Sequence, residues 1–143
     1  MAASVDLEAS GGPPRASCGP PHSLTRLTYF EGWGLAEQTR WVLAATNVDF
    51  EQVALTEHEQ FTTLRDEGSL LFKQLPLLEI DGLKLTQSQA MTRYVARKGA
   101  IDGTHNFQQG ALVDMLCEGI RDARGVVVGY AFNQDKAAHV ASI

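Results

Sequence analysis

The sequence is poor in cysteine, in positive charge and in long apolar runs, and each shortage excludes a class of protein. Its 143 residues include two cysteines, Cys18 and Cys117, too few for a disulfide framework, so we expect a reducing compartment. The formal net charge of −5 is the reverse of a basic nucleic-acid-binding surface. No apolar run approaches the roughly 18 residues that cross a bilayer. We therefore expect a cytoplasmic protein with no nucleic-acid and no membrane partner.

Signatures of metal and dinucleotide sites are also missing. The four histidines do not share a metal-ligand spacing, so we expect no metal. Gly32 and Gly34 lack the third glycine and the strand-to-helix context of a dinucleotide-binding loop.

The composition divides the chain into three parts. Residues 1–23 are crowded with Gly, Pro, Ser and Ala and lack apolar periodicity, which predicts a disordered extension. The whole chain is 44% hydrophobic, which is enough for one compact domain or for one and a fragment. A glycine-containing stretch, 99–106, suggests a boundary, and we place one domain at 24–101 and a second, partial one at 102–143.

Residue patterns in the first domain alternate between strand and helix. The patterns predict strands over Leu24–Phe30 and Asp49–Leu55 and helices over Leu35–Ala45, Glu57–Leu64 and Gln87–Lys98. The order of strands and helices predicts an α/β domain with a small mixed sheet, thioredoxin-like. Trp41 is expected in its core.

The most informative stretch runs from Gln74 to Ala90. The apolar run Leu75–Ile80 ends in Asp-Gly, a two-residue hairpin signal, and Pro76 at its head marks an edge, a bulge or a cis turn. Thr86-x-x-Gln89 fits a capping box, which predicts that a helix begins just after the hairpin. A rigid backbone edge beside a helix N-terminus can hold a small peptide and its carboxylate.

A long amphipathic helix is predicted in the second domain. Its apolar positions recur at helical spacing: Leu112, Met115, Leu116, Gly119, Ile120 and Ala123.

Four motifs in order carry a family resemblance: "LTYF", "TRWVLAATNVDFE", "QLPLLEIDGLKLTQSQA" and "ALVDMLCEGIRD". Together they resemble the tyrosine-type cytosolic glutathione transferases (alpha, mu, pi and sigma) from about Leu24 to about Asp122. The resemblance implies a thioredoxin-like glutathione-binding domain followed by an all-α domain, of which this chain carries the start. It also implies a homodimer that joins glutathione to a hydrophobic electrophile in detoxification.

The resemblance implies that Tyr29 is catalytic, its hydroxyl bonding the glutathione sulfur; from the residues alone, an ordinary aromatic strand residue is an equal alternative. It implies that Leu75 and a cis Pro76 pair with the cysteinyl part of glutathione, beside Gln74. From the residues alone, an ordinary proline at the start of a strand is an equal alternative for Pro76.

Gln87 and Ser88 are implied to hold the γ-glutamyl carboxylate at a helix start, with simple N-capping as the alternative. Arg65 and Lys73 are candidates for the glycine carboxylate, or surface cations. Asp122 is implied to reach the glutathione of a second subunit, or it forms a surface ion pair with Arg121 or Arg124.

One departure concerns the first turn. Alpha, pi and sigma members carry an arginine after the turn glycine, where this chain, like mu members, has Leu35. We therefore expect weaker activation of the sulfur than in alpha-type enzymes.

Three functional hypotheses result. The leading one is a glutathione transferase. The second is a non-enzymatic binding, structural or regulatory protein with the same fold, and the third is a glutathione-dependent isomerase or peroxidase.

Overall fold

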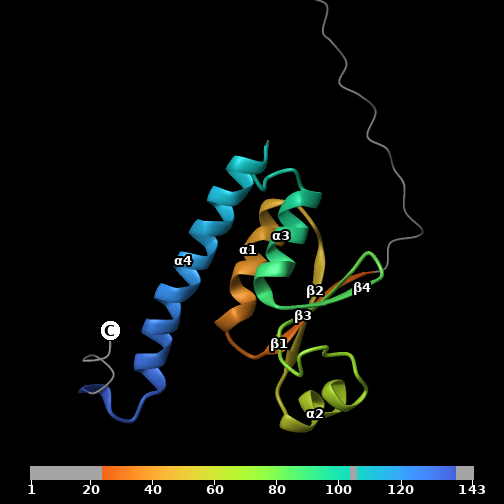
Figure 1. The fold of residues 1–143 in the computed structure, drawn as a ribbon. Helices are drawn as coiled ribbons and strands as arrows, with labels where there is room; N and C mark the ends of the chain where they lie inside the picture. Colours follow the sequence, from red (N-terminus) through yellow and green to blue (C-terminus); the bar gives the residue numbers. More distant parts are fainter. Residues whose placement is uncertain (1–23, 104–105, 138–143) are drawn as a thin grey trace, which may run out of the picture.

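A four-stranded mixed sheet forms the centre of the molecule. A computed structural model describes residues 24–103 and 106–137 (Figure 1). The expected extension over residues 1–23 lies outside these ranges. The strands stand in the order β2-β1-β3-β4, and their bounds are β1 (Thr25–Phe30), β2 (Phe50–Leu55), β3 (Leu77–Ile80) and β4 (Leu83–Thr86).

The central strand β1 pairs in parallel with β2 and antiparallel with β3. The strand β3 pairs antiparallel with β4, with Leu77 opposite Thr86. This register confirms the predicted hairpin. Its turn is Asp81-Gly82, and both residues have positive φ, 52° and 78°, as a type I′ turn requires.

Helices flank the sheet in the order expected of a thioredoxin-like domain. They are a short 3-10 helix η1 (Gly34–Ala36), then α1 (Glu37–Ala45), α2 (His58–Asp66), α3 (Ser88–Lys98) and the long α4 (Phe107–Phe132). In Figure 1, α1 and α3 lie side by side on the sheet, α2 lies away from them, and α4 runs past α1 and α3. None of the helices in the described ranges is long and apolar enough to cross a membrane.

Apolar side chains pack on both faces of the sheet. The cluster shared with α1 and α3 consists of Leu27, Ala36, Leu43, Leu78, Ile80, Met91 and Val95, all nearly or fully buried. The opposite cluster, Leu55, Leu70, Leu75 and Leu77, packs against Phe61 and Leu64 of α2. Burying each such side chain contributes about 1.5–3 kcal/mol, so the sheet is held from both sides.

The hairpin turn is fastened to α3. Tyr94 donates its hydroxyl hydrogen to Asp81 Oδ2 at 2.7 Å, and the Lys98 ammonium contacts both oxygens of the same carboxylate at 2.5 Å. The hydrogen bond to the Asp81 carboxylate raises the pKa of Tyr94, because losing the proton would set two negative charges together. These contacts fix the far end of β3 and β4 relative to the helix.

The predicted capping box at Thr86 and Gln89 is wrong. Thr86 is the buried last residue of β4, and the chain enters α3 through Gln87, which makes no side-chain capping bond. A single connecting residue leaves Thr86 in the sheet rather than at the helix start. A capping box forms instead at α2, between Glu57 and Gln60.

The prediction that Trp41 belongs to the core is also wrong. Its side chain is 70% exposed, and its indole N–H donates to Glu37 Oε1 at 2.8 Å. Trp41 therefore lies on the outer side of α1, one turn beyond Glu37, while Leu43 on the other side is fully buried.

The predicted long helix is confirmed as α4, but its apolar stripe is not packed. Leu112, Met115, Leu116 and Ile120 are each more than half exposed. Two contacts tie the helix to α3: an ion pair between Arg93 and Asp114, and a hydrogen bond from the Gln89 side chain to the Cys117 carbonyl at 3.4 Å.

Two neighbouring substitutions in α1 test this distribution of the core. We expect Leu43→Ala to lower the free energy of unfolding by about 2–5 kcal/mol, because it leaves a cavity in the cluster under α1 and α3. We expect Trp41→Ala to lower it by less than about 1 kcal/mol, because the indole packs little surface. Urea unfolding followed by circular dichroism measures both, and equal losses would contradict the assigned burial.

Candidate functional site

Tyr29 is held at the end of β1 by contacts on several sides. Its half-buried ring packs against both apolar clusters. The backbone N–H of Leu35 donates a hydrogen bond to the Tyr29 hydroxyl oxygen at 3.2 Å. Because one lone pair of the oxygen is engaged, the hydroxyl hydrogen remains available to donate elsewhere.

Gly34 makes this approach sterically possible. A Cβ atom at this position would lie 2.8 Å from Cε1 of Tyr29, and the backbone of Gly34 has φ +47°. A real Cβ atom would not tolerate so short a contact, and residues other than glycine rarely adopt a positive φ. The absence of a side chain therefore permits the tyrosine to dock against the turn.

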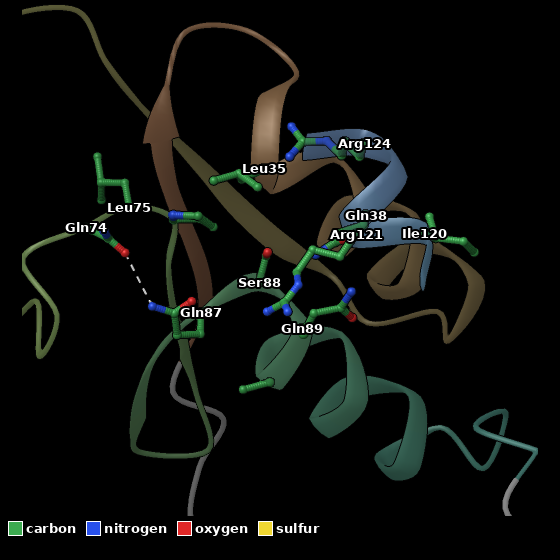
Figure 2. A pocket seen from close by; sticks show the side chains of 12 residues that line it. Leu35, Gln38, Gln74, Leu75, Gln87, Ser88, Gln89, Ile120, Arg121 and Arg124 are labelled. Carbon is green, nitrogen blue, oxygen red and sulfur yellow. Dashed lines mark hydrogen bonds between the residues drawn. The ribbon is translucent and has the colours of Figure 1, made fainter. Parts of the chain in front are cut away.

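A pocket of about 350 Å³ opens beside this turn (Figure 2). Residues from the first turn, the β3 approach, the α3 start and α4 line it: Leu35, Gln38, Gln74, Leu75, Pro76, Gln87, Ser88, Gln89, Ala90, Ile120, Arg121 and Arg124. Five of the nine predicted site residues, Gln74, Leu75, Pro76, Gln87 and Ser88, therefore share one wall.

Strand register explains why these five residues meet. Leu77 pairs with Thr86, so the residues before β3 and the residues after β4 emerge at the same edge of the sheet. A hydrogen bond at 3.4 Å joins the Gln87 amide nitrogen to the Gln74 amide oxygen across this edge (Figure 2). The hairpin brings together two segments that are 13 residues apart in the sequence.

The backbone at Leu75-Pro76 has the geometry that the resemblance implied. The peptide bond is cis. The ladder with β1 begins at Leu77, so Leu75 lies beyond the last paired residue and its main chain is outside the sheet pairing. Its side chain is nevertheless 8% exposed and belongs to the cluster under α2, which anchors the segment.

The N-terminus of α3 is open toward the pocket. Gln87 precedes the helix with φ +70° and ψ 107°, a conformation that costs a residue other than glycine on the order of 1–3 kcal/mol. No side chain caps the helix, and Figure 2 shows the Ser88 hydroxyl directed into the pocket. Free N–H groups and the positive end of the helix dipole favour a carboxylate at this position.

The two cations predicted for a second carboxylate lie outside the pocket lining. Arg65 is half-buried on α2 and forms two hydrogen bonds with Asp66, at 2.8 and 3.3 Å. These bonds are the main reason that the pKa of Asp66 is lowered, and Lys73 adds a smaller electrostatic effect. Arg65, Asp66 and Lys73 thus form a surface charge cluster, with Lys73 directly preceding Gln74 in the chain.

Asp122 is also outside the pocket lining. Its side chain is 79% exposed, and its nearest cationic partner is Arg121, at 3.8 Å. The carboxylate is therefore largely exposed to solvent on α4.

Sequence reasoning missed the contribution of α4 to the pocket. Ile120, Arg121 and Arg124 approach from the opposite side, as Figure 2 shows. Their i, i+1 and i+4 spacing places them on adjoining faces of the helix, but which face meets the pocket depends on how α4 packs. Gln38 and Gln89 were missed for the same reason.

The assembled groups suit a small anionic peptide with a reactive atom. The unpaired main chain at Leu75 can bind a peptide as an added strand, the α3 start can bind a carboxylate, and the phenol can donate to a negative atom. Across the described parts of the chain, no three His, Cys, Asp or Glu side chains gather in a way that could hold a metal ion.

Comparisons with known proteins agree with this geometry. The family model described as "Glutathione S-transferase, N-terminal domain" matches residues 25–97. Rat glutathione S-transferase alpha-3 is 42% identical over 106 residues, which cover 74% of this chain and 48% of the relative. The chain thus spans about half the length of this curated relative.

Two solved structures illustrate the shared fold. A monomeric glutathione S-transferase from the hookworm Necator americanus has a TM-score of 0.69 and 32% identity, covering 84% of this chain and 60% of its own. Prostaglandin synthase D of Nilaparvata lugens has a TM-score of 0.68 and 30% identity, covering 82% and 57%. With the matched domain occupying more than half of its length, this chain belongs to the glutathione S-transferase family.

Proposed function

We propose that the chain binds glutathione in the pocket between Leu75-Pro76 and the α3 start and joins the glutathione thiolate to a hydrophobic electrophile. One observation carries this proposal: three groups with the required chemistry lie close together at the same edge of the sheet. They are the unpaired main chain of Leu75, the open N-terminus of α3 and the turn that holds Tyr29.

In the proposed complex the γ-glutamyl carboxylate lies at the N-terminus of α3. Backbone N–H groups, the Ser88 hydroxyl and the Gln87 amide supply donors there. The cysteinyl part pairs with the main chain of Leu75 as an added strand, next to Gln74. The glycine end points toward Lys73 and Arg65, whose surface cluster lies on the Gln74 side.

Tyr29 stabilises the sulfur as a thiolate. A free thiol has a pKa near ~8.5, so only a few per cent is ionised at neutral pH. A hydrogen bond to a charged acceptor contributes about 1.5–3 kcal/mol, which lowers the pKa of the bound thiol by about one to two units. A less basic thiolate is a weaker nucleophile, with a Brønsted slope of about 0.4–0.5, so part of this gain cancels. Positioning the electrophile beside the sulfur supplies further acceleration.

The remaining predictions concern partners and compartment. We propose that Asp122 acts on the glutathione of a second copy in a homodimer, which the high exposure of its side chain supports. The similar hookworm structure is described as monomeric, so a single copy also occurs on a similar fold. We also propose a cytoplasmic location.

One observation favours a second reaction at the same site. A similar structure is that of a prostaglandin synthase, so we propose isomerisation by the same bound thiolate as the alternative to conjugation. Turnover of a prostaglandin endoperoxide without conjugation of chloronitrobenzenes would favour it. Glutathione binding without any turnover would favour the non-enzymatic alternative.

Tyr29→Phe tests the role of the phenol. We expect the apparent pKa of the bound thiol, read from the pH dependence of chlorodinitrobenzene conjugation, to rise by about one to two units. At neutral pH the rate should fall at least about threefold. At high pH, where the thiol is ionised in both proteins, the variant should become the faster enzyme, because its more basic thiolate is the better nucleophile.

Tyr94→Phe is the matched control for the loss of a phenolic oxygen. Tyr94 donates to Asp81 and does not line the pocket, so its pH profile should coincide with that of the wild type. Superimposable profiles for Tyr29→Phe and the wild type would remove Tyr29 from the mechanism.

Gly34→Ala tests the docking of the tyrosine. The new Cβ would displace the Tyr29 ring, so we expect conjugation to fall at least as far as in Tyr29→Phe. Gly82→Ala imposes a similar backbone strain, at φ +78°, with no atom within 4 Å of the new Cβ. Both variants should lose about 1 kcal/mol or more of stability, but only Gly34→Ala should lose activity. Equal activity in the two would contradict the steric argument.

Gln87→Ala tests the carboxylate site by isothermal titration calorimetry with glutathione. Removal of one hydrogen bond to a charged group should weaken binding by about 10-fold or more. Gln108→Ala, on the exposed first turn of α4 and outside the pocket, should bind as the wild type does. No loss of affinity in Gln87→Ala would exclude this residue from the site.

A further inference from the structure

The charged side chains that line the pocket are all positive. Arg121 and Arg124 are the ionisable residues among its twelve lining side chains, and no acidic residue lines it. The chain as a whole carries a formal net charge of −5, so this positive wall on α4 runs against the overall balance. Such a local excess attracts a ligand with an anionic group.

The two arginines differ in the ion pairs that they already form. Arg121 contacts Glu118 at 2.7 Å and Asp122 at 3.8 Å, so much of its charge is compensated. Arg124 pairs with no carboxylate in the ranges 24–103 and 106–137. Of the two, Arg124 has the guanidinium whose hydrogen-bonding capacity is available to a ligand.

Their places in the pocket also differ. In Figure 2 the Arg121 guanidinium extends toward Ser88 and Gln89, whereas Arg124 stands on the side of Leu35. Leu35 marks the sulfur side, because its backbone N–H holds the Tyr29 hydroxyl. Arg124 therefore borders the space that an electrophile must enter to reach the sulfur.

Apolar and cationic groups are combined at this end. Leu35 is 40% exposed and lies on the side of Arg124 in Figure 2, so it offers apolar surface near the guanidinium. A ligand that fits both has an apolar ring and an anionic substituent. Planar guanidinium groups bind carboxylates with two parallel hydrogen bonds, a geometry that lysine cannot reproduce.

We propose that Arg124 selects second substrates that carry a carboxylate, making this chain a transferase for aromatic or apolar electrophilic acids. This specificity rests on the proposed function, since it concerns the partner of the same thiolate. In the reaction with a chlorodinitrobenzoate, a carbon–sulfur bond forms as the carbon–chlorine bond breaks. Chloride leaves with the electron pair, and the carboxylate keeps its charge throughout.

The test compares two electrophiles that differ in one carboxylate, chlorodinitrobenzoate and chlorodinitrobenzene. The measured quantity is the ratio of their kcat/KM values, anionic over neutral. We expect Arg124→Gln to lower this ratio about two- to fivefold, within the range for an ion pair open to solvent. Arg124→Lys should recover part of the ratio, because it keeps the charge but loses the planar fork.

Arg26→Gln is the matched control. It removes the same unit of charge from the surface of β1, where Arg26 pairs with Glu51 at 2.9 Å and does not line the pocket. Its ratio should equal that of the wild type. An equal fall in Arg26→Gln and Arg124→Gln would show a long-range effect of net charge and overturn the proposal.

Two further outcomes would overturn it. An unchanged ratio in Arg124→Gln would exclude a contact with the substrate carboxylate. An equal fall for both electrophiles, with a shifted pH profile, would show that Arg124 acts on the thiolate instead.

A binding experiment separates this proposal from the proposed function. Calorimetry with the two preformed conjugates, dinitrophenyl-glutathione with and without the carboxylate, needs no turnover. An Arg124-dependent preference for the anionic conjugate in a chain that catalyses nothing would support the subsite and overturn the transferase activity. Binding of neither conjugate would overturn both.

Discussion

A single hydrogen bond decides which way the Tyr29 hydroxyl can act. The N–H of Leu35 occupies one lone pair of the phenolic oxygen, so the hydrogen is left to point elsewhere. This bond depends on a turn that only a residue without Cβ allows, and on a ring that packs against both apolar clusters. The chemistry proposed for the site follows from this orientation, because a misdirected phenol would give a thiolate no donor.

The pocket is a product of strand pairing as much as of its residues. The hairpin of β3 and β4 returns the chain to the edge from which it started, and Gln74 and Gln87 meet there. At the other end, the Asp81, Tyr94 and Lys98 contacts hold the turn against α3. The hairpin is thus fixed at both ends, and the peptide-binding edge and the start of α3 keep their relative positions.

Local signals gave most of the fold correctly. Asp81-Gly82 specifies its turn by its own backbone preferences, and alternation of apolar residues identifies the strands without tertiary information. Five of the predicted site residues line the pocket because they flank that hairpin. Tyr29 adjoins the pocket by way of the turn at Gly34 and Leu35, while Arg65, Lys73 and Asp122 lie outside it.

Features that depend on packing between elements were not predictable. Arg121 and Arg124 have the pattern of an ordinary solvated helix face, and only the placement of α4 brings them to the pocket. Trp41 has the side chain of a core residue, yet its position on α1 is the side away from the sheet, where Glu37 accepts its N–H. Thr86 and Gln89 have the spacing of a capping box, but Thr86 is the last residue of β4 and therefore cannot cap the helix.

The sparse attachment of α4 affects how readily this helix opens in the folded protein. Among the described residues, the extensive packing is between the strands and α1 and α3, while α4 is fastened by an ion pair and a side-chain hydrogen bond. A helix fastened so lightly opens at a smaller free-energy cost than one whose side chains are interlocked with a sheet. Amide hydrogens along α4 should accordingly exchange with deuterium well before those of α3, so that the α4 wall of the pocket opens more readily than the wall formed by α3.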